Sequence, residues 1–288
     1  MDIFIQLTLN GIIAGSIYAL VALGFNLIYG TVRFFDLGYS ALIAVGGYAV
    51  FFLSRQVGLP LLLSILIGTL VAGVVGYIIY QLVYVPLRKR KASNMVLLVA
   101  SLGIFTVVQA VVAILFSSQF RTLSRPVDAQ RIFYVFGGSI TEIQVMILAT
   151  SVVVMFALAM IFRFTLLGKS IRAIGDNEEV SKIVGINTSR IIGYVFFIGS
   201  AIAGLVGILV GFDTGINPTM GFSLLLKGVV ASIIGGVGNV YGGVIGALFL
   251  GLIENYGIWH IGTEWKDAIA FGLLILFLLF RPQGIFKK

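Results

Sequence analysis

Three ionisable side chains interrupt otherwise apolar stretches of the sequence: Asp36, Lys227 and Glu254. A lone charge at membrane depth is costly, so each of the three is a candidate for a solute path. Each also has a structural alternative. Asp36 can pair with Arg33, three residues earlier; Lys227 can snorkel to the membrane surface; Glu254 can cap the end of its helix.

The sequence shows no machinery for catalysis. It has no cysteine and one histidine, His260, which excludes thiolate and multi-histidine metal sites. Gly168-Lys169-Ser170 ends like a P-loop, but that motif requires a glycine at position 163, where Arg163 stands. We therefore expect a protein that is not an enzyme and that holds neither a metal nor a cofactor of its own.

The composition is that of an integral membrane protein. Of the 288 residues, 59% are hydrophobic and 10% are charged, whereas a soluble domain has about 25% charged residues. So few charges cannot cover a water-soluble globule, which excludes a soluble enzyme, a nucleic-acid partner and a disordered chain. The net charge of +8 indicates basic loops next to an anionic leaflet.

Uncharged stretches predict an all-α polytopic membrane protein with about eight to nine transmembrane helices, some of them interrupted or re-entrant. These stretches occupy residues 3–32, 37–54, 56–87, 92–120, 143–162, 191–212, 228–253 and 268–280. The glycine-rich sequence 235–239 breaks the region 214–259 into two short segments joined near or below the cytoplasmic interface, and a re-entrant pair is equally consistent. Small residues recur every fourth position, as in Gly199-Ala203-Gly207-Gly211, which favours close helix packing within the chain.

Lysine and arginine positions predict the orientation. The basic segments 88–91 and 163–190 and the tail from Arg281 to Lys288 are expected on the cytoplasmic side. The connection 119–142 is then external in spite of its three arginines, and the N-terminus is external as well. We expect a multi-pass protein of the cell inner (plasma) membrane with a cytoplasmic C-terminus.

The segment 165–190 contains a short amphipathic helix. Asp176 or Asn177 can cap its start, two glutamates follow in its first turn, and Gly185 can end it. Its apolar face consists of Val180, Ile183 and Val184. A helix of barely two turns is unstable alone in water, so this face requires a partner.

Several longer motifs stand along the chain: GKSIRAIGDN at 168–177, VGIN at 184–187, GFSLLLKG at 221–228 and IGGVGNVYGG at 234–243. Together with GLIE at 251–254, KD at 266–267 and RPQGI at 281–285, they resemble the permease subunits of branched-chain amino-acid ABC importers, in particular the shorter of the two homologous permeases. Related subunits serve urea and other amides or amino acids. The resemblance covers essentially the whole chain.

The chain departs from the family pattern after its first span. Where the family has a stretch like R-x-x-N-F-A-H-G-E, this sequence reads RFFDLGYSA at 33–41, with Asp36 in place of asparagine. The resemblance therefore leaves the substrate open between a branched-chain amino acid, a polar amino acid and urea or an amide.

The resemblance implies one permease domain, 1–288, with the ABC importer permease fold and a coupling segment at 165–190. The implied partners are a second homologous permease, two cytoplasmic subunits that bind the ATP, an extracytoplasmic solute-binding protein and a small-molecule substrate. The expected ATPase-coupling residues are Gly168, Arg172, Asp176, Glu179, Ile183, Val184 and Gly185. The expected substrate path includes Asn26, Asp36, Lys227, Gly235, Gly236, Gly238 and Glu254.

One alternative from another class remains at this point. An ion-coupled secondary transporter would use buried acids such as Asp36 and Glu254 and would need no ATPase. A membrane-embedded enzyme would need clustered polar groups, which the sequence does not show.

Overall fold

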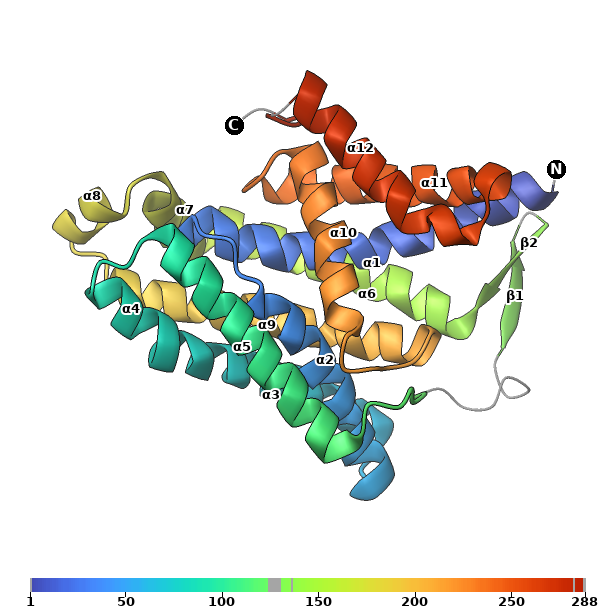
Figure 1. Ribbon diagram of the computed structural model, residues 1–288, viewed down its shortest axis with the longest axis horizontal. Helices are drawn as coiled ribbons and strands as arrows, with labels where there is room; N and C mark the ends of the chain where they lie inside the picture. Colours follow the sequence, from blue (N-terminus) through green and yellow to red (C-terminus); the bar gives the residue numbers. More distant parts are fainter. Residues whose placement is uncertain (1, 124–130, 136, 282, 287–288) are drawn as a thin grey trace.

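The computed structural model describes residues 2–123, 131–135, 137–281 and 283–286, and it is a bundle of helices (Figure 1). The main helices are α1 (Asp2–Val32), α2 (Gly38–Phe51), α3 (Leu61–Ile79), α4 (Val85–Lys89), α5 (Asn94–Phe116), α6 (Glu142–Phe164), α7 (Leu166–Asp176), α8 (Glu178–Ile183), α9 (Thr188–Asp213), α10 (Met220–Gly235), α11 (Val240–Ile261) and α12 (Lys266–Phe280). Three short segments complete them: the π-helices η1 (Phe52–Gln56) and η2 (Tyr80–Tyr84) and the 3₁₀ helix η4 (Thr263–Trp265).

Within the described residues, seven helical segments are long and apolar enough to cross a membrane. They are Ile3–Val32, Gly38–Gln56, Leu61–Lys89, Asn94–Phe116, Glu142–Phe164, Thr188–Asp213 and Val240–Ile261. The shorter apolar helix α10 adds an eighth candidate, and α12 is a further apolar helix of 15 residues. The prediction of an all-α polytopic membrane protein is confirmed.

The predicted break after α10 is also confirmed. α10 ends at Gly235, the turn contains Gly236 and Gly238 at φ +109° and +82°, and Asn239 caps α11 by accepting backbone hydrogen bonds from Tyr241 and Gly242. Positive φ values suit glycine because it has no Cβ. The second segment has 22 residues, which is long enough to span the membrane by itself, so the prediction that both segments are short is wrong for α11.

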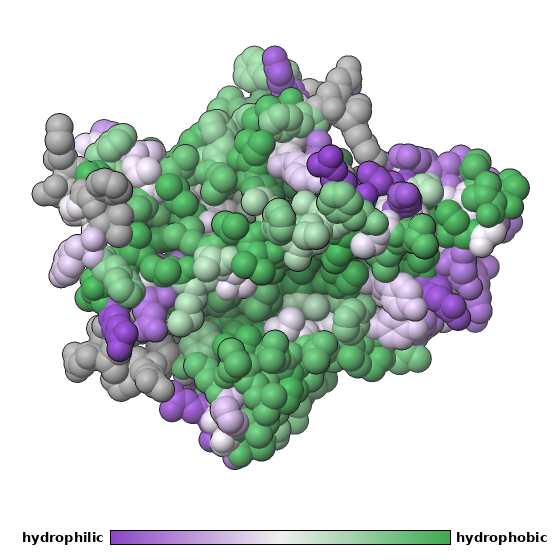
Figure 2. Space-filling model, turned by 180° about the vertical axis from the view of Figure 1, so that it is seen from behind, coloured by the Kyte–Doolittle hydropathy of each residue, from purple (hydrophilic) through white to green (hydrophobic). Residues whose placement is uncertain are grey.

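The centre of the bundle consists of α1 and α9, and α5 and α6 lie at its periphery. Among the candidate spans, α1 and α9 are the most buried inside the protein, and α5 and α6 are the least buried. Large apolar side chains such as Ile114, Val153 and Phe156 are exposed on the peripheral helices. Figure 2 shows hydrophobic residues over most of one face, with hydrophilic residues gathered toward its edges. Such a surface suits hydrocarbon and not water.

Small residues allow α1 and α11 to pack antiparallel along their length. A Cβ at Gly11 would press on Leu252, and a Cβ at Gly15 would press on Leu248. Gly251 lies directly against the backbone of both glycines. The stripes at 11–19 and 243–251 therefore serve packing within the chain, as expected.

The helices α2, α3 and α9 approach one another in the same way. A Cβ at Gly46 would overlap the backbone of Gly204, and a Cβ at Gly207 would overlap the carbonyl of Ile43. At Gly76 a Cβ would overlap the side chain of Ser200. Of the predicted stripe itself, Gly207 faces Ile43 of α2 and Gly199 faces Ile28 of α1, while the contacts with α3 involve Ser200 and Gly204 beside the stripe.

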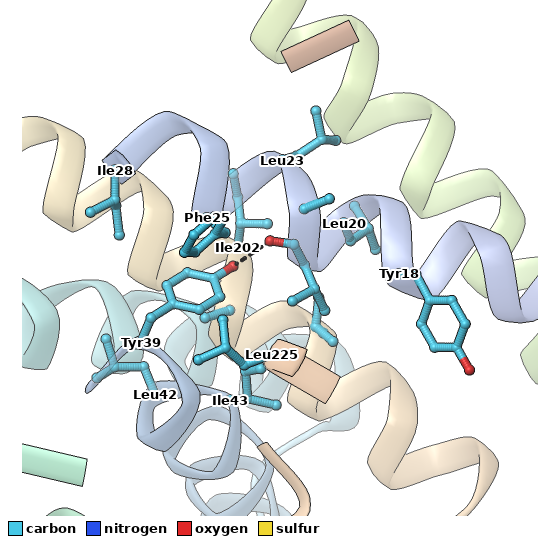
Figure 3. Packing of buried hydrophobic residues seen from close by; sticks show 14 of the residues in the cluster. Tyr18, Leu20, Leu23, Phe25, Ile28, Tyr39, Leu42, Ile43, Ile202 and Leu225 are labelled. Atoms are coloured by element: carbon cyan, nitrogen blue, oxygen red, sulfur yellow. Dashed lines mark hydrogen bonds between the residues drawn. The ribbon is translucent and has the colours of Figure 1, made fainter. Parts of the chain in front are cut away.

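Tyr39 connects α2 to the central helix α1. Its ring is fully buried, and its hydroxyl donates a hydrogen bond of 3.4 Å to the carbonyl of Val21. Figure 3 shows the ring among Phe25, Ile43 and other apolar side chains. Gly24 leaves the space that the hydroxyl occupies, because any Cβ there would overlap it.

One end of the bundle, called the basic end below, brings together the basic segments 88–91 and 163–190. Arg88 forms an ion pair with Glu178, and Arg33 at the end of α1 donates a hydrogen bond to the carbonyl of Gly175. The tail joins this end, since the N–H of Ile285 donates to the carbonyl of Ile234. The two basic segments therefore lie on the same side of the bundle.

The opposite end carries a feature that the sequence analysis missed. The strands β1 (Ile132–Val135) and β2 (Gly138–Thr141) form an antiparallel hairpin in the connection between α5 and α6. The start of α1 lies beside it, because Gln6 accepts a hydrogen bond of 2.8 Å from the N–H of Ser139. The beginning of α1 and residues 283–286 thus lie at opposite ends of the bundle, here called the hairpin end and the basic end.

Gly207→Ala tests the packing of α9 on α2. We expect it to lower the free energy of unfolding by about 3 kcal/mol, at the upper end of the range for overpacking, because the clash is with backbone. Gly103→Ala is the matched control, since nothing lies within 4 Å of its Cβ position. Thermal unfolding in detergent measures both variants, and equal stability of the two would contradict the packing assigned to Gly207.

Candidate functional site

Three side-chain caps shape the chain at the basic end. Thr165 accepts a hydrogen bond from the N–H of Gly168 and begins α7, Asn177 accepts from Glu179 and Val180 and begins α8, and Asn187 caps α9. Each cap satisfies N–H groups that a helix start would otherwise leave unpaired. Of the two predicted caps for α8, Asn177 is therefore correct, while Asp176 is the last residue of α7.

The helix α7 was not predicted. Its inner side packs through Ile171 and Ile174, which are buried, and through two glycines. A Cβ at Gly168 would overlap the backbone of Phe162, and a Cβ at Gly175 would press on the carbonyl of Gly30. Gly168 is thus a packing residue of the chain itself, and its expected contact with an ATPase stays a prediction. The start signal, Thr165 before an i, i+3 apolar pattern, was present in the sequence.

The apolar face of α8 is exposed, as expected. Ile183 is 84% exposed, Val184 69% and Val180 53%. Gly185 follows with φ +88° and reverses the chain after the helix. Arg172 and Glu179 are exposed nearby. A six-residue helix therefore presents apolar side chains that nothing else in the described chain covers.

An ion-pair network holds α8 in place. Glu178 pairs with Arg88 of α4 and, at 2.9 Å, with Lys182 one turn later. Burial alone would raise the pKa of the Glu178 carboxyl, but the hydrogen bond from Lys182 and the charge of Arg88 outweigh it and hold the pKa below its usual value. The carboxylate is therefore ionised at neutral pH and ties α8 to α4.

Lys227 and Glu254 belong to a second network, toward the hairpin end. The Nζ atom of Lys227 lies 3.2 Å from Glu254 Oε1 and 3.1 Å from Asp267 Oδ1. Tyr18 donates a hydrogen bond of 2.7 Å to Glu254 Oε2, and Lys266 Nζ lies 3.9 Å from the same oxygen. Two cations and two anions from α10, α11 and α12 thus offset one another, with Tyr18 of α1 beside them.

This network bears on the structural alternatives that the sequence left open for Glu254 and Lys227. Glu254 is fully buried and α11 continues to Ile261, which excludes the alternative that Glu254 caps the end of its helix. The Lys227 side chain is 11% exposed and is held by two carboxylates. The opposite charges could be read from the sequence, but their pairing across 27 residues could not.

A cavity of about 330 Å³ lies beside the network. Its polar lining includes Asn10, Gln144, Asp213, Asn255 and Lys266, and its other walls are mainly apolar side chains of α1, α9 and α10. An ammonium, a carboxylate and two kinds of amide therefore face one space with apolar walls. This arrangement suits a small zwitterion with an apolar side chain. None of these five polar residues was predicted to lie on the substrate path.

Asp36 is buried at the basic end and does not pair with Arg33. Its Oδ1 accepts hydrogen bonds of 2.6 Å from the Tyr84 hydroxyl and 2.9 Å from the N–H of Gly38. Arg33 has φ +59° and points instead to the carbonyl of Gly175. The predicted ion pair is therefore wrong. Burial raises the pKa of the Asp36 carboxyl to about 6, against the lowering effect of its hydrogen bonds.

Asn26 holds the turn between α10 and α11. Its Oδ1 accepts from the N–H of Gly238 at 3.0 Å, and its Nδ2 donates to the carbonyl of Asn239. At Gly235, a Cβ would overlap the carbonyl of Gly242, and at Gly236 it would press on the carbonyl of Phe286. The turn is closely packed, and its expected place on the substrate path stays a prediction.

Among residues 2–123, 131–135, 137–281 and 283–286, no group of three or more His, Cys, Asp or Glu side chains is placed to hold a metal ion.

Comparisons with known proteins agree with this architecture. Residues 7–278 match the family model of the branched-chain amino acid transport system permease component. The high-affinity branched-chain amino acid transport system permease protein BraD of Pseudomonas aeruginosa is 31% identical, over 99% of this chain and 96% of that protein. LivH of Escherichia coli K12, which carries the same description, is 32% identical with the same coverage. The ribose import permease protein RbsC of Haemophilus influenzae is 28% identical over 96% of this chain and 82% of that protein.

The apolar, glycine-packed bundle with charges and a cavity in its interior defines a polytopic membrane transport protein. More narrowly, the chain belongs to the family of branched-chain amino acid transport system permeases, which are transport components and not enzymes.

Lys227→Met tests the network around Glu254. We expect the variant to lose about 3–5 kcal/mol of unfolding free energy, because it leaves a buried carboxylate without its main partner. The double variant Lys227→Met/Glu254→Gln removes both charges and should recover most of that loss. Thermal unfolding in detergent compares the three proteins. A double variant as unstable as the single one would show that the ion pair is not what matters there.

Asp36→Asn tests the buried carboxyl. In the folded protein the raised pKa disfavours ionisation of Asp36. The contribution of this carboxyl to stability is therefore fully present below its usual pKa of 3.8 and is lost as the pH rises through about 6. Asparagine keeps the acceptor oxygen and stays neutral, so the variant should gain about 1–3 kcal/mol at pH 8 and little at pH 3.5. Glu179→Gln, at an exposed carboxyl, is the control. A stability difference that does not change between these pH values would contradict the assignment.

Proposed function

We propose that the chain is the permease subunit of an ABC importer that carries branched-chain amino acids. The descriptions of the two relatives at 31% and 32% identity support this substrate. The cavity supports it as well, since Asp213 and Lys266 carry charges opposite to those of an amino acid's ammonium and carboxylate groups. The apolar walls suit an aliphatic side chain.

The partners follow from the same proposal. A homologous permease would complete the path, two cytoplasmic subunits would bind and hydrolyse ATP, and an extracytoplasmic protein would deliver the solute. The chain then lies in the cell inner membrane with its basic end in the cytoplasm, as the positive-inside rule favours. The start of α1 and the hairpin are external, and the tail is cytoplasmic.

The observation that carries the proposal is the exposed apolar face of α8. A capped helix that is held by Arg88 and Glu178 keeps Ile183 84% exposed. Exposed apolar side chains on a rigid helix suit insertion into a groove of a partner protein. We assign this surface to the ATPase, with Val184 and Val180 beside Ile183 and with Arg172, Asp176 and Glu179 at its polar edge.

An ion-coupled transporter would predict a different outcome. It would use the buried acids Asp36 and Glu254 and would transport in the absence of any ATPase. The packing around both acids speaks against this alternative, because each carboxylate is already held by a tyrosine hydroxyl and at least one further donor or cation.

The experiment is uptake of labelled leucine by the chain reconstituted with its homologous permease, the ATPases and the binding protein. We expect uptake that depends on ATP and stops with vanadate, and we expect Ile183→Asp to reduce it at least tenfold, because a charge in an apolar groove costs docking energy. Urea and a polar amino acid, each tested with the same system, decide among the alternative substrates.

Ile183→Leu is the matched control and should transport normally, since it keeps an apolar side chain of the same volume. Neither variant should change the thermal stability of the chain, because position 183 is exposed. Normal co-purification of the ATPases with Ile183→Asp would overturn the role of α8. Uphill uptake by the chain alone would overturn the function.

A further inference from the structure

A second pocket lies at the basic end, outside the coupling surface and the cavity. Its volume is about 310 Å³, and it lies between α4, α8 and the start of α9. Figure 1 shows α4 and α8 next to each other at this end of the molecule. Its lining combines charged residues with the apolar side chains of Val85 and Ile192.

The pocket is strongly cationic. Arg88, Lys89 and Lys182 line it together with one acid, Glu178, so three positive charges face one negative charge. Glu178 engages one terminal nitrogen of Arg88 and the ammonium of Lys182, and both groups have further N–H donors. Within the part of the chain that the structure describes, Lys89 has neither an ion pair nor a hydrogen bond. Donors and charge therefore remain for an anion.

The pocket also borders the lipid-facing surface. Ile78 and Leu82 are exposed on the helix that leads into α4, Leu82 to 72%. Val85 and Lys89 follow Leu82 at spacings of three and four residues in the same continuous helical stretch, and both line the pocket. An apolar strip thus runs along the span and ends at cations where lipid headgroups lie.

We propose that this pocket binds the phosphate of an anionic phospholipid. The phosphate would accept hydrogen bonds from Arg88 and Lys89 of α4 and from Lys182 of α8, and the acyl chains would lie along Ile78 and Leu82. Such a lipid bridges α4 and α8 and supplements the single carboxylate of Glu178 that joins them. Basic pockets between transmembrane helices at the cytoplasmic side suit headgroups of this kind.

The test is lipid binding by the full chain alone in detergent, measured by native mass spectrometry during titration with phosphatidylglycerol. We expect saturable binding, weaker binding of the zwitterionic phosphatidylcholine, and roughly tenfold weaker phosphatidylglycerol binding by Lys89→Gln/Lys182→Gln, since each cation near a headgroup contributes to affinity. Arg163→Gln/Lys169→Gln is the matched control: it removes two exposed cations of the same end that do not line the pocket, and it should bind within about twofold of the wild type.

Competition separates lipid from soluble phosphate. Inorganic phosphate and glycerol phosphate should not displace the lipid, because they lack the acyl chains that the apolar strip contacts. Displacement at equal concentration would overturn the lipid assignment, and so would equal loss of binding in the two double variants. Lys89→Gln alone, at an exposed position without partners, guards against misfolding and should also weaken binding. The measurement needs no ATPase, so it stands or falls separately from the proposed transport function.

Discussion

The structure depends on one constraint: helices in hydrocarbon gain nothing by hiding apolar side chains, because lipid is just as apolar. What holds α1 against α11, and α9 against α2 and α3, is close backbone contact at glycine and other small residues. Gly15 against Leu248, and Gly207 against Ile43, are places where a single methyl group has no room. This explains a chain with 36 glycines, an amount that would weaken helices in water but here permits the contacts that replace the hydrophobic effect.

Such packing determines where polar groups can be tolerated. Where the bundle is packed this closely, little water can screen a charge, so a buried charge needs an opposite charge or hydrogen-bond donors. Lys227 and Glu254 satisfy this requirement with Asp267, Lys266 and Tyr18, and Asp36 does so with Tyr84 and a backbone N–H. The cavity beside the network of Lys227 and Glu254 is where charged side chains can still bind a ligand, because Asp213 and Lys266 lie on its walls.

Local sequence patterns predict part of the fold. Spans follow from uncharged length, the break after α10 follows from Gly235, Gly236 and Gly238, and the start of α8 follows from an asparagine before two glutamates. Asp36 shows where such reasoning fails: Arg33 is close in sequence, but the partner is Tyr84, 48 residues away. Partners of this kind depend on how helices cross, which no local pattern encodes. The hairpin at 132–141 was missed because four-residue strands carry little periodicity.

The basic end and the cavity are joined through α1. Near the basic end, Gly30 touches Gly175 of α7, and Arg33 holds the same residue by a hydrogen bond. Toward the other end, Asn10 and Tyr18 of α1 line the cavity, and Tyr18 also holds Glu254. α1 is one continuous helix whose glycines lie directly against α11, so these two sets of contacts are connected by a single well-packed element. One helix therefore touches both α7, which leads directly into α8, and the walls of the cavity.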